Sequence, residues 1–292
     1  MQIQKSFKGQ SAYGKLYLVA TPIGNLEDMT FRAIQTLKEV NWIAAEDTRN
    51  TGLLLKHFDI PTKQISFHEH NAKEKIPDLI DLLKQGQDVA QVSDAGLPSI
   101  SDPGHDLVKA AILEDIAVVT VPGASAGISA LIASGLAPQP HIFYGFLPRK
   151  SGQQKQFFES KKDYPETQIF YESPHRVADT LENMIEVYGD RSVVLVRELT
   201  KIYEEYQRGH ITELLDSIAE TPLKGECLLI VEGASQEVED KDEEDLFAEI
   251  QARLQQGIKK NQAIKEVAKI YKWNKSQLYA AYHEWEDNQF ND

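Results

Sequence analysis

The chain has 292 residues, of which 41% are hydrophobic and 26% are charged. This balance is typical of a globular protein and excludes a disordered chain, and the length favours two compact units with an appendage. The formal net charge is -14 at pH 7. Such acidity argues against a protein that coats nucleic acid indiscriminately, because that binding requires many phosphates to be neutralised. Any RNA that the protein binds must therefore meet a local basic patch.

The chain contains one cysteine, Cys227, which excludes an intramolecular disulfide and a cysteine cluster for zinc. Its apolar neighbours Leu228 and Leu229 indicate a buried structural thiol. The first thirteen residues lack the apolar stretch of a signal peptide, and no later run is long enough to span a bilayer. We therefore expect a soluble cytoplasmic protein without a membrane partner.

The first half of the chain alternates short apolar runs with helical patterns. Strands are expected near residues 15–20, 42–45, 88–93 and 116–121, and a helix with apolar residues at helical spacing near 33–40. This alternation predicts a largely parallel sheet covered on both faces, forming an N-terminal α/β domain over residues 1–138. Ligands of such sheets bind outside the carboxyl ends of the strands.

The pattern breaks at residues 136–140, and a second set of strands is expected near 142–147, 168–171, 192–196 and 227–231. We assign residues 139–233 to a second α/β domain and the acidic stretch 234–242 to a linker. Residues 243–292 form a helical tail whose three helices are compatible with a helix-turn-helix unit. Asn261 and either Asn274 or Ser276 are expected helix N-caps.

Three loops that follow predicted strands, at residues 21–28, 93–104 and 122–127, are rich in Gly, Pro, Asp and Ser. None matches GxGxxG or a Walker motif, which disfavours ordinary Rossmann redox chemistry and nucleotide hydrolysis. Taken singly, each loop is also explained by tight turns and close helix packing. We interpret Asp94 as an acceptor for ligand hydroxyl or amino groups and Asp102 as the cap of a helix beginning at Pro103.

Six segments together carry a family resemblance: LVATPIGNLEDMTFRA, AAEDTRNT, VSDAGLPSISDPG, VPGASA, FYGFLPRK and FYESPHR. Between about Gly14 and Gly233 the chain resembles the ribosomal RNA small-subunit methyltransferase I family of the tetrapyrrole-methylase superfamily. The resemblance implies two α/β domains with S-adenosylmethionine in the cleft between them, usually a homodimer, and methylation of the ribose 2′-oxygen of a cytidine. The first loop departs from the GxGPGD of the tetrapyrrole branch, which disfavours a tetrapyrrole substrate.

The site residues follow from this resemblance. The predicted cofactor site comprises Pro22, Gly24, Asp94, Ala95, Gly96, Pro122, Gly123, Ser125 and Ala126. Methyl transfer is an in-line displacement, and a ribose hydroxyl is a poor nucleophile that needs a positioned base. The predicted catalytic residues are Glu46, Asp47, Arg49, Glu172, His175 and Arg176. We expect Arg49, Arg149 and Arg176 to grip phosphates, and the alternative for each charged residue is an ordinary surface ion pair.

Two further patterns leave alternatives open. His68 and His70 share a face of a strand without an evident third ligand, so we predict no metal site. The tail carries lysines among aromatic residues, which is either an RNA-binding patch or a solvated face over an aromatic core. The expected partner is small-subunit ribosomal RNA within the assembled subunit, and no DNA partner is expected. Competing functions are methylation of a tetrapyrrole or a protein, and a non-catalytic RNA-binding, ligand-sensing or ribosome-assembly protein.

Overall fold

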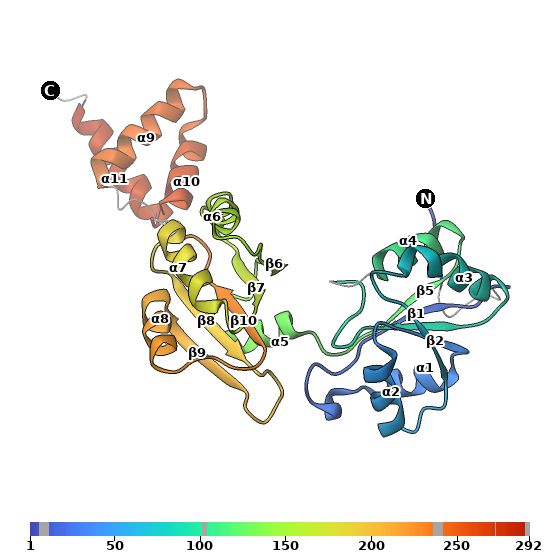
Figure 1. The fold of residues 1–292 in the computed structure, drawn as a ribbon. Coiled ribbons are helices and arrows are strands. Elements are labelled where there is room, and N and C mark those ends of the chain that lie inside the picture. The colour runs from blue at the N-terminus through green and yellow to red at the C-terminus, as the bar shows by residue number, and fades with distance from the viewer. Residues whose placement is uncertain (6–11, 101–103, 236–241, 272, 290–292) are drawn as a thin grey trace. The chain divides into compact units, whose positions relative to one another are not determined.

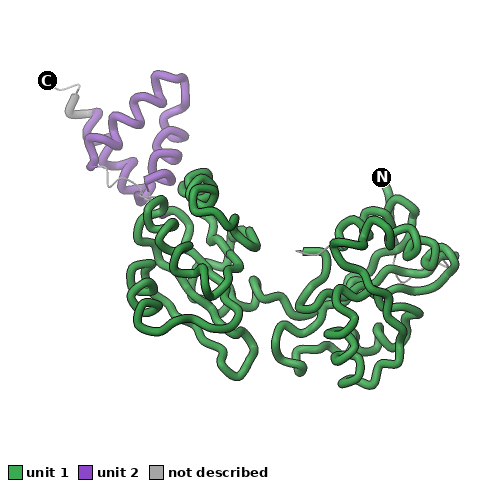
Figure 2. Tube along the Cα trace, in the orientation of Figure 1, with its two compact units in different colours: residues 1–234 green, residues 235–292 purple. Residues whose placement is uncertain are grey.

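The computed structural model describes residues 1–5, 12–100, 104–235, 242–271 and 273–289. The chain divides into two compact units, Met1–Ala234 and Ser235–Asp292 (Figure 2). Each unit has its own hydrophobic core. Asp102 and Pro103, which the sequence predicted to begin a helix, lie outside the described residues.

The first unit contains a five-stranded sheet in the order β3-β2-β4-β1-β5, in which every neighbouring pair is parallel. All four residues of β4 are buried, as expected for a strand covered on both faces. The strands of this sheet are β1 (Leu16–Val19), β2 (Trp42–Ala45), β3 (Lys63–Ser66), β4 (Val89–Val92) and β5 (Val118–Val121).

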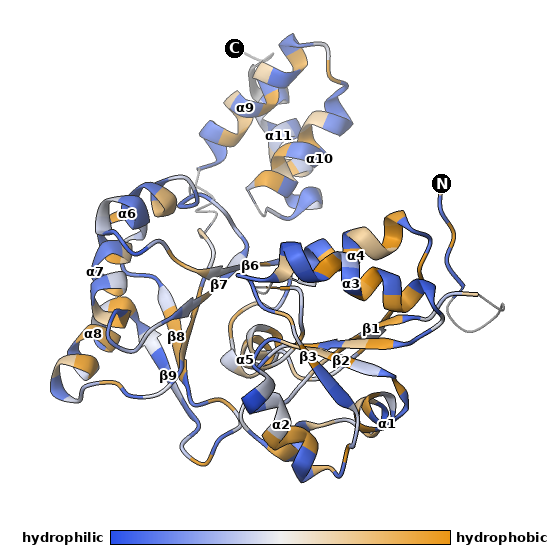
Figure 3. Cartoon of the chain, turned by 45° about the vertical axis from the view of Figure 1, so that its right-hand side comes forward, coloured by the Kyte–Doolittle hydropathy of each residue, from blue (hydrophilic) through white to orange (hydrophobic). Residues whose placement is uncertain are grey.

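Helices cover both faces of this sheet. On one face, Leu37 and Leu55 pack into a core with strand residues, and on the other Leu83 and Leu107 do the same. The apolar spacing that places these side chains inward leaves the opposite helix faces polar, and Figure 3 shows α3 and α4 alternating between hydrophobic and hydrophilic residues. The elements are η1 (Leu26–Asp28), α1 (Phe31–Glu39), α2 (Thr48–His57), α3 (Ala72–Lys84) and α4 (Gly104–Leu113).

A second five-stranded sheet follows in the same unit, in the order β6-β7-β10-β8-β9 (Figure 1). The β6–β7 pair is parallel and the other pairs are antiparallel. Its strands are β6 (His141–Phe146), β7 (Thr167–Glu172), β8 (Ser192–Arg197), β9 (Glu205–His210) and β10 (Cys227–Val231).

The second sheet is also covered by helices on its two faces. Leu131 of one helix packs on one side, whereas Phe158, Leu181 and Leu214 of three others pack in a separate core. Cys227 is a buried free thiol whose pKa burial raises to about 11, as expected for an unreactive structural cysteine. The helices are α5 (Ala126–Ser134), α6 (Ser151–Glu159), α7 (Val177–Tyr188) and α8 (Ile211–Glu220).

The second unit is helical, with α9 (Glu243–Gln255), α10 (Lys260–Ile270) and α11 (Lys275–Gln289). Its core combines aliphatic residues with Phe247 and Tyr282, and Tyr271, Trp273 and Trp285 pack against it. Asn274 accepts hydrogen bonds from the backbone N–H groups of Ser276 and Gln277, as a cap does. The expected cap at Asn261 is wrong, because α10 begins at Lys260 and its cap position is Lys259, two residues before Asn261.

The predicted α/β class with a helical C-terminal unit is confirmed. Two edge strands were not predicted, namely β3 and β9. Both sit at the ends of their sheets and carry polar sequences, KQIS and EYQRGH, so neither shows the apolar run that marks a buried strand. Within the described ranges, no helix is both long and apolar enough to cross a membrane.

Candidate functional site

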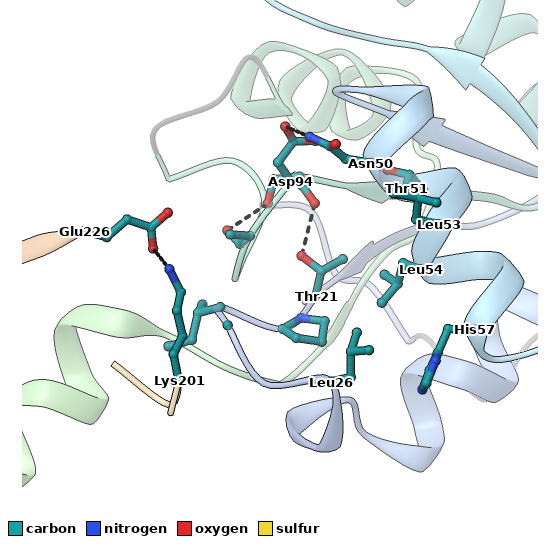
Figure 4. A pocket seen from close by; sticks show the side chains of 15 residues that line it. Thr21, Leu26, Asn50, Thr51, Leu53, Leu54, His57, Asp94, Lys201 and Glu226 are labelled. Atoms are coloured by element: carbon teal, nitrogen blue, oxygen red, sulfur yellow. Dashed lines mark hydrogen bonds and ion pairs between the residues drawn. The ribbon is translucent and has the colours of Figure 1, made fainter. Parts of the chain in front are cut away.

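A pocket of about 440 Å³ lies beyond the carboxyl ends of β1 and β4 (Figure 4). This is the position at which open α/β sheets bind ligands. The loops after these strands form part of it, α2 forms another part, and two charged residues from loops that flank strands of the second sheet complete it. The lining residues are Thr21, Pro22, Ile23, Gly24, Leu26, Asn50, Thr51, Leu53, Leu54, His57, Ser93, Asp94, Ala95, Lys201 and Glu226.

The loops after β1 and β4 are joined by hydrogen bonds. The backbone N–H of Thr21 donates to the carbonyl of Gly96 at 2.9 Å, and the N–H of Gly96 donates back to Thr21 at 3.1 Å. The Thr21 hydroxyl also donates to the carbonyl of Ser93 at 3.0 Å. Gly96 has a φ of +76°, a conformation that favours glycine, so the sequence Asp-Ala-Gly fits this turn for a backbone reason.

Three predicted residues lie together at the ends of β2 and β4. The Asp94 carboxylate accepts hydrogen bonds from the backbone N–H of Asp47 at 3.2 Å and from the side-chain amide of Asn50 at 3.1 Å. The N–H of Asp94 donates to the Glu46 carboxylate at 3.3 Å. These bonds connect the AAEDTRNT and VSDAG segments, so Asp94, which lines the pocket, is joined to Glu46 and Asp47, which do not line it.

Asp47 caps the N-terminus of α2 and binds Arg49. Its carboxylate accepts from the Arg49 backbone N–H at 2.8 Å and from the guanidinium at 2.6 and 3.1 Å. These hydrogen bonds, those from the side chain first, lower the pKa of Asp47 to about 2. A carboxylate with so low a proton affinity is a weak base near neutral pH, so its geometry suits it to hold Arg49. The Arg49 side chain is 88% exposed and faces solvent.

The nine predicted cofactor residues divide into two groups. Pro22, Gly24, Asp94 and Ala95 line the pocket, and Gly96 fixes the turn beside it. The other four follow β5 and do not contribute to the lining: Pro122, Gly123, Ser125 and Ala126. A Cβ on Gly123 would lie 2.7 Å from the Cβ of Ala20, so close packing against the end of β1 is one reason for glycine there.

The catalytic candidates of the FYESPHR segment lie outside the pocket lining. Glu172 is buried at the end of β7, where its carboxylate accepts from the Thr180 hydroxyl at 2.9 Å and pairs with Arg176 at 3.2 Å. Arg176 also donates to the carbonyl of Pro148 at 2.9 Å. His175 is exposed on the loop between them. Glu172 and Arg176 therefore brace the neighbouring loop 147–150, on which Arg149 is exposed.

Sequence reasoning missed Lys201, in the turn between β8 and β9, and Glu226, directly before β10, which both line the pocket. The Lys201 ammonium lies 3.0 Å from Glu198 and 3.1 Å from Glu226. Burial opposes its charge, but the hydrogen bonds to both carboxylates raise the pKa of Lys201, so it is a cationic donor at neutral pH. Only the folded arrangement reveals these residues, because the segment RELTKIYEE reads as an ordinary charged turn.

Among the residues that the structure describes, no group of three or more His, Cys, Asp or Glu side chains is placed to hold a metal ion. His68 and His70 lie in the loop after β3 and not on a strand, so the expectation that they share a face of a strand is wrong, and their rings lie 6.0 Å apart at an angle of 65°. His68 donates its backbone N–H to the Asn71 side chain at 2.9 Å, which fixes the loop after β3.

The fold defines the class of protein. The chain matches the solved structures of diphthine synthase (TM-score 0.59, 13% identity, 75% of this chain and 90% of the other) and of cobalt precorrin-4 methyltransferase (TM-score 0.56, 17% identity, 75% and 94%). It also matches uroporphyrin-III-C-methyltransferase from Thermus thermophilus (TM-score 0.51, 21% identity, 75% and 94%). The model of the Tetrapyrrole (Corrin/Porphyrin) Methylases covers residues 15–215. The chain thus has a methyltransferase fold.

Relatives of known sequence narrow this class. A Streptococcus pyogenes serotype M1 protein named ribosomal RNA small subunit methyltransferase I is 71% identical over 286 residues, covering 97% of this chain and all of the relative. A Bacillus subtilis (strain 168) protein of the same name is 49% identical over 96% of this chain and 98% of its own length. The chain belongs to the ribosomal RNA small subunit methyltransferase I family, as its motifs predicted.

Proposed function

We propose that this chain transfers a methyl group from S-adenosylmethionine to the ribose 2′-oxygen of a cytidine in small-subunit ribosomal RNA. The observation that carries the proposal is the 71% identity, over nearly the whole chain, to a relative named as a methyltransferase of that RNA. The choice of donor, atom and nucleoside rests on the resemblance of the six sequence motifs to the family. We propose further that the protein acts in the cytoplasm, as a homodimer, on the assembled subunit.

The pocket fits the proposed cofactor. Its volume of about 440 Å³ lies within the range of about 300–1,000 Å³ that small-molecule sites occupy. Leu26 and Leu54 provide apolar surface, and the exposed Asp94 carboxylate accepts hydrogen bonds from hydroxyl or amino groups. When bound, S-adenosylmethionine supplies an electrophilic methyl group on a sulfonium. Pro122, Gly123, Ser125 and Ala126 remain proposed contacts on the neighbouring loop.

The acceptor hydroxyl needs a group that takes its proton during an in-line displacement. Asp47 is a poor choice, because Arg49 holds its pKa at about 2. Glu46 lies next to Asp94, whose backbone N–H fixes its carboxylate at 3.3 Å. We assign Glu46 as the leading candidate for the base and keep His175 as the alternative. Replacement of both without loss of turnover would contradict the assignment.

Exposed cations provide the proposed contacts to RNA phosphates. Arg49 and Arg149 are exposed, whereas Arg176 is committed to Glu172 and to the carbonyl of Pro148. In the helical unit Lys260 pairs with Glu286 and lies 5.4 Å from the ring centre of Tyr282, so it is less suited to phosphate binding. The proposed RNA patch of the tail consists of Lys259, Lys265, Lys269 and Lys275, all exposed. Lys272 falls outside the described residues.

The decisive experiment incubates the purified protein with methyl-labelled S-adenosylmethionine and small ribosomal subunits from cells that lack this activity. Nucleoside mass spectrometry then identifies the product, and the expected result is labelled 2′-O-methylcytidine. Naked RNA and assembled subunits are compared as substrates in parallel. Label in another nucleoside or atom would overturn the proposed specificity. Cofactor binding without any transfer to RNA would instead favour a tetrapyrrole or protein acceptor, or a ligand sensor.

A further inference from the structure

Lys201 and Glu226 form a donor and acceptor pair on the side of the pocket that the second sheet provides. The Lys201 ammonium donates to the Glu226 carboxylate at 3.1 Å, and both side chains line the pocket. Figure 4 shows the pair across the pocket from the residues of α2. The Lys201 side chain is 29% exposed and that of Glu226 is 79% exposed. The pair therefore presents a charged donor and a carboxylate acceptor, side by side, to whatever enters the pocket.

The pair is held in place by Glu198. One oxygen of the Glu198 carboxylate accepts both the Lys201 ammonium at 3.0 Å and the backbone N–H of Glu226 at 2.9 Å. The backbone hydrogen bond from Glu226, followed by that from Lys201, lowers the pKa of Glu198, so the anchor remains ionised at neutral pH. An ammonium has three N–H donors, and the two carboxylates use two of them. One donor of Lys201 therefore remains for a ligand.

The backbone around the pair is strained. Glu198 and Thr200 have φ values of +51° and +66°, in the left-handed region that non-glycine residues seldom adopt. The N–H of Thr200 is held by the Glu204 carboxylate at 2.6 Å, while the buried Thr200 hydroxyl oxygen has no hydrogen-bond partner. Strained conformations and unsatisfied polar groups concentrate where a loop must present side chains in a fixed geometry. The turn between β8 and β9 has both properties beside the pocket.

The first loop approaches this turn closely. A Cβ on Gly24 would lie 2.7 Å from Cγ of Lys201 and 3.0 Å from the carbonyl oxygen of Leu199. Glycine at position 24 is thus what lets the turn lie against the loop after β1. The lysine and glutamate are positioned by three constraints: the Glu198 anchor, the strained turn and the contact with Gly24.

The chemistry of the pair matches one base edge. Cytosine presents an amino donor next to a ring-nitrogen acceptor, whereas uracil presents a carbonyl acceptor next to an N–H donor. For a base held with its 4-position substituent at the carboxylate, a carboxylate beside an ammonium complements the first order and opposes the second. We propose that Glu226 accepts from the amino group of the acceptor cytosine while Lys201 donates to its ring nitrogen, so that the pair selects cytidine over uridine. This inference rests on the proposed function, and it requires the base to leave its stack, as bases read at this edge do.

The adenine of the cofactor offers the same order of donor and acceptor, so it is the other source of this chemistry. The exposure of Glu226 favours the RNA base, because a base attached to a large substrate arrives from solvent. Asp94 and the side chains bonded to it, on the β4 and α2 side of the pocket, remain available to bind the cofactor. The two sources predict different losses, in base selection for one and in cofactor affinity for the other.

The test compares small subunits that carry either cytidine or uridine at the position that the wild-type enzyme methylates. Methyl transfer is measured for the wild type and for Glu226→Gln, and binding of S-adenosylhomocysteine is measured by calorimetry. A glutamine side chain can donate to the uracil carbonyl, so the ratio of kcat/KM for cytidine over uridine is expected to fall about tenfold to hundredfold. Cofactor affinity and the thermal midpoint should stay unchanged. Glu220→Gln, an exposed change outside the pocket lining, is the matched control.

Lys201→Met adds a second arm, in which loss of the donor should lower kcat/KM for cytidine without weakening cofactor binding. A cytidine preference that survives in both variants would overturn the inference while leaving the proposed function intact. Weakened S-adenosylhomocysteine binding with an unchanged preference would assign the pair to adenine and would also overturn it. A wild-type enzyme that methylates no cytidine would overturn the proposed function and this inference together.

Discussion

Two carboxylate–arginine pairs occupy different environments in the same unit. Asp47 and Arg49 lie 2.6 Å apart beside the pocket, with the arginine side chain 88% exposed. Glu172 and Arg176 lie 3.2 Å apart at the end of β7, and the side chain of Glu172 is 1% exposed. The sequence presents both as charged residues of a family motif. Burial separates them, because a solvated pair can meet a substrate whereas a buried pair mainly supports its own fold.

The buried pair belongs to a network of polar side chains. Glu172 accepts from the Ser173 backbone N–H at 2.8 Å and from the Thr180 hydroxyl, which also accepts from Gln154 at 3.3 Å. Such a network stabilises the fold only while every member keeps its partners. The exposed pair has no such dependence, so removal of one member from each pair should give contrasting results.

The largest expected effect is that of Glu172→Ala. The substitution leaves Arg176 and the Thr180 hydroxyl without their buried partner, and we expect the free energy of unfolding to fall by about 3 kcal/mol. Urea denaturation followed by circular dichroism measures it. Glu186→Ala removes the exposed pair with Lys155 and should cost less than about 1 kcal/mol. Equal stabilities of the two variants would show that the Glu172 network does not brace the fold.

The second prediction concerns Asp94, on the exposed side of the comparison. Asp94→Asn keeps the shape but removes the charge that accepts from the Asp47 N–H and the Asn50 amide. We expect kcat/KM for methyl transfer to fall by about tenfold to hundredfold, the value of a charged hydrogen bond. The free energy of unfolding should change by less than about 1 kcal/mol, because the side chain is exposed.

Asp216→Asn, an exposed change on α8, is the control for Asp94→Asn and should leave both quantities unchanged. Undiminished methyl transfer by Asp94→Asn would remove Asp94 from the proposed cofactor site. A loss of stability as large as that of Glu172→Ala would instead show that Asp94, too, is chiefly structural.

The third prediction tests the close approach between the first loop and the β8–β9 turn. Gly24→Ala places a methyl group 3.0 Å from the Leu199 carbonyl oxygen, so the two segments must separate slightly. We expect a loss of about 1 kcal/mol in unfolding free energy and a several-fold lower kcat/KM. Gly152→Ala, where no atom lies within 4 Å of the new Cβ, is the matched control. An unchanged Gly24→Ala enzyme would mean that the contact with Lys201 does not position the turn.

The sequence predicted the buried strands well, because a buried strand needs an apolar run in order to pack. Cys227–Val231, for example, is buried at every position and was predicted with the bounds that the structure shows. The edge strands β3 and β9 were missed, since a strand with one free edge does not need an apolar run. Helix N-caps were predicted only in part, because Asn274 caps α11 whereas Asn261 caps nothing.

The residues of the candidate site likewise fall into those that the sequence predicts and those that it does not. Asp94, Asp47 and Glu46 follow strands of one parallel sheet, so their meeting at its carboxyl edge follows from topology. Lys201 lines the pocket from the β8–β9 turn, and Glu226 lies 25 residues further along the chain. No spacing rule relates either residue to Asp94. The burial of Glu172 depends on helix α7 folding over β7, which motif reading does not register.

The smallest expected effect is electrostatic and concerns the exposed pair. The pKa of Asp47 in the folded protein, about 2, lies below its ordinary value of 3.8 because Arg49 hydrogen-bonds the carboxylate. The stabilisation that this pair contributes is thus present above about pH 4 and is lost as the pH falls toward 2.

Arg49→Ala should return the pKa of Asp47 toward its ordinary range, as NMR titration of the carboxylate would show, with little change in stability at neutral pH. Lys56→Ala, on the same helix but outside this pair, should leave the Asp47 titration unchanged. If Asp47 still titrated near pH 2 in Arg49→Ala, the backbone N–H groups at the start of α2, and not the guanidinium, would hold its charge.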